Sequence, residues 1–155
     1  MTTTLTGIMS DHHAWCDARV VAVAADIGRS AWTEARTHAA MVRHALEWHI
    51  DAEETTLFPA FEAATGNTHG PTEVMRREHQ RIRAFFDACD EAIDKRLAPA
   101  AADAIAQLQT LLSQHNIKEE RILYPWCEQA LGERVDTLVD ELQRNMRMVS
   151  PRETD

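Results

Sequence analysis

HIDAEETTLFP at residues 49–59 and HNIKEERILYP at residues 115–125 share one pattern, H-x-x-x-E-E-x-x-L-F/Y-P. A spacing of four places a histidine and the first glutamate, His49 with Glu53 and His115 with Glu119, on one helical face about one turn apart. Each pair also falls on the apolar stripe of its helix, where a carboxylate is costly to bury unless a cation or a hydrogen-bond donor meets it. The repeat therefore predicts two helices that face a positively charged group.

Apolar residues recur at helical spacing in five stretches, and sustained apolar and polar alternation is absent, which predicts an all-α protein. Helix starts are expected where N-cap residues or prolines precede an apolar stripe, and ends where glycine or proline follows it. The expected helices run from Ser10 to about Asp26, from Ser30 or Ala31 to the mid-sixties, from Pro71 to about Leu97, from about Pro99 past Pro125, and over about residues 133–148.

Two prolines and one loop shape the expected architecture. Pro59 should kink or break the second helix, and Pro125 should disturb the fourth, because proline lacks the N–H that a helix interior uses. Residues 65–71 carry the strongest turn chemistry and should form the main connecting loop. We expect one domain over residues 1–155, an up-down four-helix bundle at about residues 10–130 that the last helix caps.

Each expected helix has a stripe of residues that should face the core. Histidines or glutamates interrupt four of these stripes, which is unusual for a buried surface. The stripes comprise His13, Cys16, Val20, Val23 and Ile27; Val42, Leu46, His49, Glu53 and Leu57; Met75, His79, Ile82, Phe86, Cys89 and Ile93; Ile105, Leu108, Leu112, His115, Glu119 and Ile122; and Val135, Leu138, Leu142 and Met146.

Four imidazoles and two carboxylates thus converge on the predicted core. They are too many for one tetrahedral zinc ion and include no thiolate, but they suit two adjacent ions that share bridging carboxylates. A ferritin-type site would use Glu-x-x-His motifs at a spacing of three, which disfavours that class. The candidate metal ligands are His13, His49, Glu53, His79, His115 and Glu119.

The doubled motif, an Asp-His pair near the N-terminus and Glu78-His79 on the third helix form a combination that resembles the hemerythrin-like, or HHE cation-binding, family. The resemblance covers roughly residues 10–130. It implies that the six candidate residues bind two iron ions, with Glu53 and Glu119 as carboxylate bridges and an oxo or hydroxo group as a further bridge.

One departure from that family concerns its third helix. The oxygen-carrying hemerythrins supply two histidines four residues apart there, whereas this chain has Met75 and Arg83 on either side of His79. The chain is therefore more similar to the branch with four histidines and two glutamates, which includes iron-sulfur-cluster repair proteins and iron- or oxygen-sensing domains. Fewer protein ligands leave more positions for water, dioxygen or nitric oxide, and Met75 would line the open side.

Several neighbouring residues allow two interpretations. Of the adjacent His12 and His13 only one can face the site; the stripe spacing favours His13, and His12 remains the alternative. For Glu54 and Glu120 a solvated face or a salt bridge is favoured over a hydrogen bond to a ligand imidazole. The aromatic and sulfur side chains that should pack the core are Trp15, Trp48, Met75, Phe86, Tyr124 and Trp126, and the hydroxyl of Tyr124 could approach the metals. Three histidines are assigned no role: His38, His44 and His69.

Composition excludes several classes of protein. The 155 residues are 45% apolar and 26% charged, which is typical of a globular domain. A net charge of −9 disfavours nucleic acid as a partner, and no apolar run approaches the length of a membrane span. Because no secretory leader is recognisable, we expect a cytoplasmic protein. Three distant cysteines, Cys16, Cys89 and Cys127, suggest free thiols.

Three functions are compatible with these features. The favoured hypothesis is a di-iron protein, not an enzyme, that binds or senses dioxygen or nitric oxide. The second is a di-iron enzyme that acts on peroxide or nitric oxide or in iron-sulfur cluster repair; the resemblance counts against repair, because the cysteine-bearing N-terminal domain of the repair proteins is missing. The third is a metal-stabilised interaction module that dimerises through the last helix.

Overall fold

The computed structural model describes residues 3–149, so the first two and last six residues of the expected domain lie outside the described residues. The described part contains helices and turns but no strand. The elements are α1 (Leu5–Gly28), α2 (Trp32–Ala52), η1 (Glu53–Leu57), α3 (Phe58–Thr65), α4 (Pro71–Asp94), α5 (Ala98–Lys118), η2 (Glu119–Leu123), α6 (Tyr124–Leu131) and α7 (Arg134–Val149).

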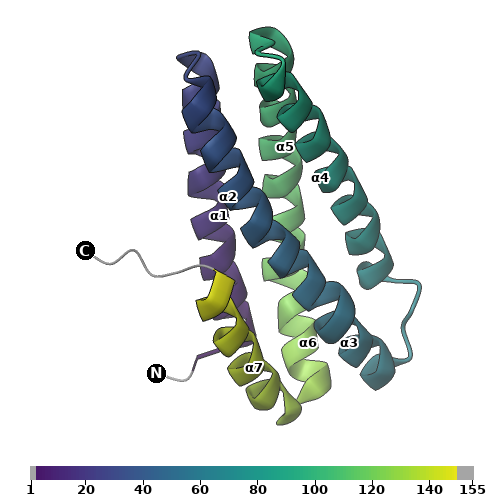
Figure 1. Cartoon of the computed structure of the whole chain (residues 1–155). Coiled ribbons are helices and arrows are strands. Elements are labelled where there is room, and N and C mark those ends of the chain that lie inside the picture. Colours follow the sequence, from purple (N-terminus) through teal and green to yellow (C-terminus); the bar gives the residue numbers. More distant parts are fainter. Residues whose placement is uncertain (1–2, 150–155) are drawn as a thin grey trace.

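The helices form the expected up-down bundle. α2 continues into α3 and α5 into α6 as one long rod each, and α1, the α2–α3 rod, α4 and the α5–α6 rod run in alternating directions (Figure 1). Within the bundle α1 packs on α2 and α5, while α4 packs on α5 and α2. The predicted loop follows α3, which ends at Gly66 in the left-handed region with φ 69°. The prediction of an all-α, up-down four-helix bundle is confirmed.

The second half of the bundle repeats the first at a constant distance along the chain. α4 begins 66 residues after α1 (Pro71 against Leu5), and α5 begins 66 residues after α2 (Ala98 against Trp32). Even the connecting turns match, since Ser30 and Arg96 adopt positive φ angles of 55° and 54° at equivalent places. The internal repeat therefore extends well beyond the two sequence motifs.

Each motif contains a wide π-helical turn directly before its proline. The N–H of Phe58 donates to the carbonyl of Glu53, five residues back, and Tyr124 does the same to Glu119. Proline cannot make the helical hydrogen bond and its ring clashes with the preceding turn, so the helix widens before it and continues afterwards. The predicted interruptions at the prolines are thus π-helical turns within continuous helices, and Glu53 and Glu119 are the first residues of these turns.

Three details of the expected helices are wrong. The first helix begins at Leu5 instead of Ser10, because the hydroxyl of Thr4 accepts from the N–H of Gly7 at 3.0 Å and caps it. Ile122 was expected in the core but is 59% exposed, since the wide turn changes the rotation and brings the next residue inward. Trp126, also expected in the core, is 39% exposed.

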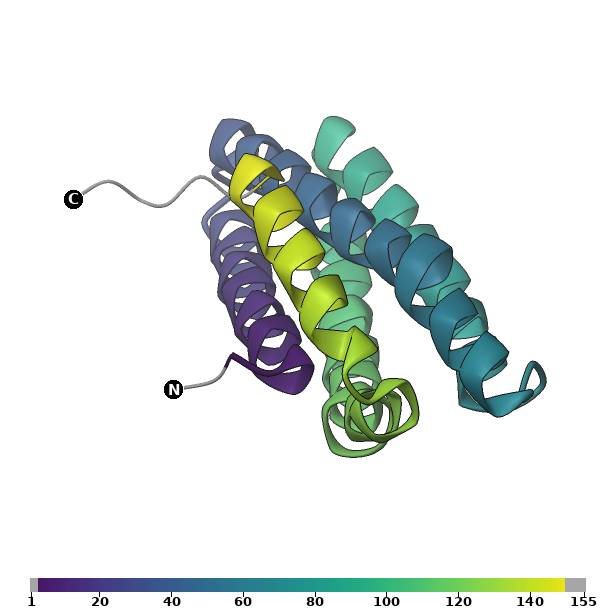
Figure 2. The same ribbon diagram turned by 90° about the horizontal axis from the view of Figure 1, so that it is seen from below.

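Most of the other expected core residues are buried in two apolar clusters, whereas Trp15, Trp48 and Val135 pack against these clusters partly buried and Met146 is partly buried outside them. One fills the bundle between the upper parts of the four helices and includes Val42, Phe86 and Leu108. The other includes the last apolar residues of both motifs and is covered by α7, whose Leu138 and Leu142 are buried. α7 contacts α1, α2 and α6 and caps the lower end of the bundle (Figure 2). No helix in residues 3–149 combines the length and apolar character of a membrane span.

Candidate metal centre

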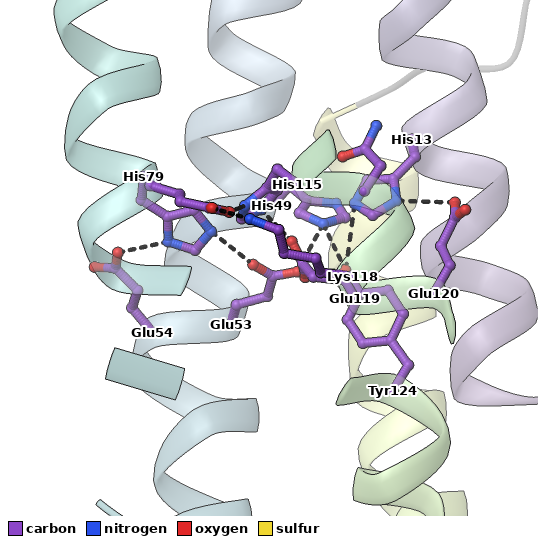
Figure 3. A network of polar contacts seen from close by, with 12 residues as sticks. His13, His49, Glu53, Glu54, His79, His115, Lys118, Glu119, Glu120 and Tyr124 are labelled. Carbon is purple, nitrogen blue, oxygen red and sulfur yellow. Dashed lines mark hydrogen bonds and ion pairs between the residues drawn. The ribbon is translucent and has the colours of Figure 1, made fainter. Parts of the chain in front are cut away.

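The six predicted ligand residues come together between the two apolar clusters. All of them are at most 3% exposed. They form two groups of four in which the candidate ligand atoms lie within 4.8 Å of one another, and both groups contain the same two glutamates. The groups are His13, His49, Glu53 and Glu119, and Glu53, His79, His115 and Glu119 (Figure 3).

Glu53 faces both groups with its two oxygens. Oε1 lies 2.8 Å from Nε2 of His49, and Oε2 lies 3.1 Å from Nε2 of His79. Glu119 contacts Nε2 of His115 through Oε1. The i, i+4 spacing of each motif therefore brings an imidazole and a carboxylate into contact, as the sequence predicts, and the bundle then places the two pairs face to face.

Tyr124 extends its hydroxyl into the first group. The hydroxyl donates to Oε1 of Glu53 and lies 3.1 Å from Nε2 of His49 and 3.3 Å from Nε2 of His13. Burial raises the pKa of Tyr124 well above its ordinary value, and the charges of Glu119 and Glu53 raise it further. The phenol is therefore a neutral hydrogen-bond donor beside the carboxylates, as the sequence suggested.

The outer ring nitrogens of three of these histidines meet carboxylates. Nδ1 of His13 lies 3.1 Å from Glu120, and Nδ1 of His79 lies 2.7 Å from Glu54. Because an ionised carboxylate only accepts, each Nδ1 donates and leaves Nε2 free to bind a metal. The prediction that a solvated face or a simple salt bridge is more probable for these two glutamates is wrong.

Glu78 plays the same part for His115, whose Nδ1 lies 2.8 Å from its Oε2. The other oxygen of Glu78 meets the ammonium group of Lys118. A hydrogen bond from His115 holds the pKa of Glu78 at about 2, against the effect of burial. The sequence interpretation assigned no contact to this glutamate, although its place beside His79 was a usable signal.

His49 differs from the other three, because its Nδ1 lies 2.9 Å from Nδ1 of His12. His12 is buried, and its pKa is lowered to about 3 by burial and then by the neighbouring His49 and His13. The structure thus places His13 in the cluster and His12 behind it. Of the two alternatives that the sequence left open, the geometry favours His13.

The chemistry of this donor set fits a cation. Buried polar atoms usually have well-formed hydrogen bonds, yet within the described residues Oε2 of Glu53, Nε2 of His79 and both carboxylate oxygens of Glu119 have none. Oε2 of Glu53 meets Nε2 of His79, and Oε1 of Glu119 meets Nε2 of His115, only in ion-pair contacts without hydrogen-bond geometry. All four atoms point into the same space between the helices (Figure 3). Imidazole nitrogens and carboxylate oxygens that are buried together without donors are the ligands that transition-metal ions take.

Without metal, opposite charges within the cluster satisfy one another. Burial alone would raise the pKa of Glu53, but hydrogen bonds with Glu119 and His79 bring it down to about 2. Burial alone would lower the pKa of His115, but Glu119, Glu78 and Glu53 raise it to about 10. A metal ion bound at Nε2 would replace such a proton, so binding should release protons.

The cysteines and the remaining histidines take no part in the cluster. Burial raises the pKa of Cys16 and of Cys127 to about 12, so neither offers a thiolate at neutral pH. His44 and His69 are exposed and lie outside the cluster. His38 is not merely solvated, because its Nδ1 lies 2.5 Å from the buried carboxylate of Asp26, far from the centre.

Comparison with known proteins agrees with this site. The chain matches the hemerythrin HHE cation-binding domain over residues 4–127 and belongs to that family. It is 31% identical over 101 residues to the iron-sulfur cluster repair protein YtfE of Edwardsiella ictaluri (strain 93-146). That match covers 59% of this chain and 44% of the relative, so the chain spans less than half of the relative's length. No solved structure gives a significant match. The family and the His and Glu clusters together define a metal-binding protein.

Proposed function

We propose that this chain is a non-haem di-iron protein that binds or senses dioxygen or nitric oxide in the core of the bundle. In this proposal the two shared carboxylates bridge the ions. The pair His13 and His49 binds one ion, and the pair His79 and His115 binds the other. Supporting observations come from the arrangement of the ligands, from the family and from the apolar surroundings of the site.

The observation that carries the proposal is the pair of four-residue clusters that share Glu53 and Glu119. One ion would need only one such cluster, whereas two adjacent ions need two clusters with carboxylates in common. A structural zinc site is closed by four ligands and commonly uses thiolates, which are absent from both clusters. Imidazole and carboxylate ligands with open positions suit iron.

Bound ferrous ions would supply the electrons and the open coordination position that dioxygen or nitric oxide requires. The protein contributes the surroundings. Met75, Phe58 and Leu123 are buried in the apolar cluster directly below the site and keep bulk water away. The neutral phenol of Tyr124 is the hydrogen-bond donor that faces the centre, and it can stabilise a bound anion.

An enzymatic role is the second candidate, because the relative from Edwardsiella ictaluri is described as an iron-sulfur cluster repair protein. The same ligands could serve reduction of peroxide or nitric oxide, or delivery of iron. Reversible binding and turnover are distinguishable in one experiment. A ligand that is released unchanged indicates carriage or sensing, whereas consumption of peroxide or nitric oxide with a reductant indicates catalysis.

The experiment measures metal content by mass spectrometry and the visible spectrum before and after exposure of the anaerobic ferrous protein to air. The unmodified chain should contain two iron ions and gain an absorption band on exposure. The double variant His49→Ala with His115→Ala, which removes one imidazole from each cluster, should contain almost no iron.

The matched control is His44→Ala, which removes an exposed histidine of α2 outside the clusters and should leave metal content unchanged. Circular dichroism establishes that each variant is folded. An unmodified chain that folds without metal and whose spectrum is insensitive to both histidines would contradict the proposal.

A further inference from the structure

The constant repeat distance gives each residue of the centre a counterpart in the other half. Counterparts are His13 with His79, His49 with His115, Glu53 with Glu119, and Glu54 with Glu120, each pair 66 positions apart. Their contacts match as well, since Glu54 meets His79 and Glu120 meets His13. Any counterparts that differ in chemistry therefore make the two metal positions different.

One such difference lies behind the ligand histidines of α2 and α5. Nδ1 of His115 meets the carboxylate of Glu78, whereas Nδ1 of His49 meets the imidazole of His12, the counterpart of Glu78. With Nε2 of His49 used for metal, its Nδ1 carries the proton and His12 accepts it. A carboxylate acceptor raises the basicity of a ligand imidazole and strengthens its bond to the metal, while a neutral imidazole adds no charge.

His12 is also poorly satisfied in this position. Within the described residues its Nε2 is buried and has no hydrogen-bond partner. The ring lies between Trp15 and Trp48, with centroid distances of 6.3 Å and 5.1 Å. The surroundings of Nδ1 of His49 are therefore aromatic and uncharged, whereas Nδ1 of His115 faces a carboxylate that is itself paired with an ammonium group.

The second difference lies below the ligands. Tyr124 donates its hydroxyl to Oε1 of Glu53, the oxygen that faces His49. Its counterpart Phe58 has no hydroxyl and stacks on His79 with a centroid distance of 5.9 Å. A hydrogen bond to a carboxylate oxygen withdraws electron density from that oxygen, so Glu53 is the weaker ligand on the side of His49.

We infer that the two metal positions are unequal and that the ion between His13 and His49 is the weaker, exchangeable one. Both differences act in the same direction. The ion between His79 and His115 has a carboxylate Nδ1 partner for each histidine, and Oε2 of Glu53, the oxygen on its side, is not the one that Tyr124 contacts, so it is the permanent one. This inference rests on the proposed function, because it assumes that both positions bind metal.

More distant charges act in the opposite direction but are screened. Lys118 offsets part of the charge of Glu78, and Arg83 lies 3.9 Å from Glu54. On the other half the exposed Asp17 adds a negative charge near His13. Lys118 and Arg83 are 44% and 32% exposed, and water and salt weaken charges at such positions. The buried contact at Nδ1 should therefore decide the order of affinity.

Variants with a single position test the order directly. His49→Ala leaves the cluster of His79 and His115, and His115→Ala leaves the cluster of His13 and His49. Anaerobic titration with Fe²⁺ against a chelator measures the dissociation constant of the remaining ion. We expect the ion in His49→Ala to bind at least about ten-fold more tightly, the lower end of the usual effect of an outer hydrogen-bond partner. Raising the salt concentration should leave this order unchanged.

Substitutions that make the halves alike test the cause in the full chain. His12→Glu introduces the missing carboxylate, and Tyr124→Phe removes the hydroxyl in favour of the side chain that its counterpart already has. Each should slow the loss of the more labile iron to a chelator, His12→Glu by about ten-fold, and leave the slower phase unchanged. The mirror variant Glu78→His should accelerate the slower phase. Tyr124→Phe keeps the shape of the core, so this test remains if His12→Glu does not fold.

The outcomes separate this inference from the proposed function. Two release phases that the variants shift as described, with the tighter ion in His49→Ala, would support it. Two ions of equal affinity in the unmodified chain, or a tighter ion in His115→Ala, would overturn the inference alone. An unmodified chain that binds no iron would overturn the proposed function together with it.

Discussion

The two halves of the bundle, residues 5–65 and 71–131, share their helix boundaries but only some of their core side chains. Val20 of α1 corresponds to Phe86 of α4, and Ala39 of α2 corresponds to Ile105 of α5; all four are buried. The ligand residues and the prolines of the two motifs, Pro59 and Pro125, are in contrast the same in both halves. The comparison teaches that backbone plan and ligands define the centre, while packing around it can vary as long as the volume is filled.

A buried ion pair present in one half shows how far this variation goes. Asp26 is 2% exposed and is paired with His38 and Arg29. Its counterpart is Ala92, and the counterpart of His38 is Ala104. The second half has two alanines at these places and the same helix boundaries, which fits the small net contribution of buried ion pairs relative to apolar packing.

The largest expected effect comes from residues that belong to both halves of the centre. Glu53→Ala or Glu119→Ala removes a ligand from each cluster, so either substitution should abolish binding of both ions. A single histidine substitution removes a ligand from one cluster and should leave one ion in place. Metal content by mass spectrometry checks this, and retention of one full ion in Glu53→Ala would show that the clusters are independent.

The counterparts His49 and His115 should give the metal-free protein opposite dependences on pH. Burial and the nearby His13 lower the pKa of His49, so its contribution to stability is present above its ordinary pKa of about 6.5 and is lost as the pH falls. The pKa of His115 is raised to about 10, so its contribution is present below about 6.5 and is lost as the pH rises toward 10.

Urea denaturation of the metal-free chain at a series of pH values between about 5 and 9 measures how the free energy of unfolding changes with pH. His115→Gln should flatten the decline of the unfolding free energy above neutrality, and His49→Gln should flatten the decline below it. Bound metal should reverse the alkaline decline, because metal replaces protons on the imidazoles. Identical pH profiles for the two variants would show that the halves of the metal-free centre are electrostatically equal.

A smaller effect is expected at the ion pair that only the first half contains. His38→Ala alone should lower the free energy of unfolding by about 1–3 kcal/mol, because a buried carboxylate loses a partner. The double variant Asp26→Ala with His38→Ala reproduces the second half and should cost less than His38→Ala alone. Chemical denaturation of the three proteins measures the difference. A double variant that is less stable than either single variant would contradict the comparison.

The smallest expected effect lies in the two equivalent turns. Ser30 and Arg96 occupy the left-handed region, where glycine is favoured over other residues. Ser30→Gly and Arg96→Gly should each raise the free energy of unfolding by up to about 1 kcal/mol, since relief of strain exceeds the added entropy of the unfolded chain. The two increments should be similar and additive in thermal unfolding. A loss of stability in one turn alone would show that the turns are not equivalent.

Much of the fold and of the candidate site could be predicted from the sequence because both depend on short-range spacing. A stripe of apolar residues requires only the helical period, and His49 with Glu53 requires only a spacing of four. The same reasoning failed where the helix leaves that period. Ile122 lies in a π-helical turn, so its exposure depends on a local change of pitch that the regular pattern does not reveal.

The sequence alone determined the helical class, the bundle and the six residues that meet in its core, because a repeated motif on amphipathic helices has one compact arrangement. Only the tertiary structure decided which side chain contacts Nδ1 of each ligand histidine. Glu54, Glu120 and Glu78 reach histidines of other helices, and His12 takes the fourth such place. Those contacts depend on how neighbouring helices are rotated against each other, which is set by packing across the bundle and not by spacing along the chain.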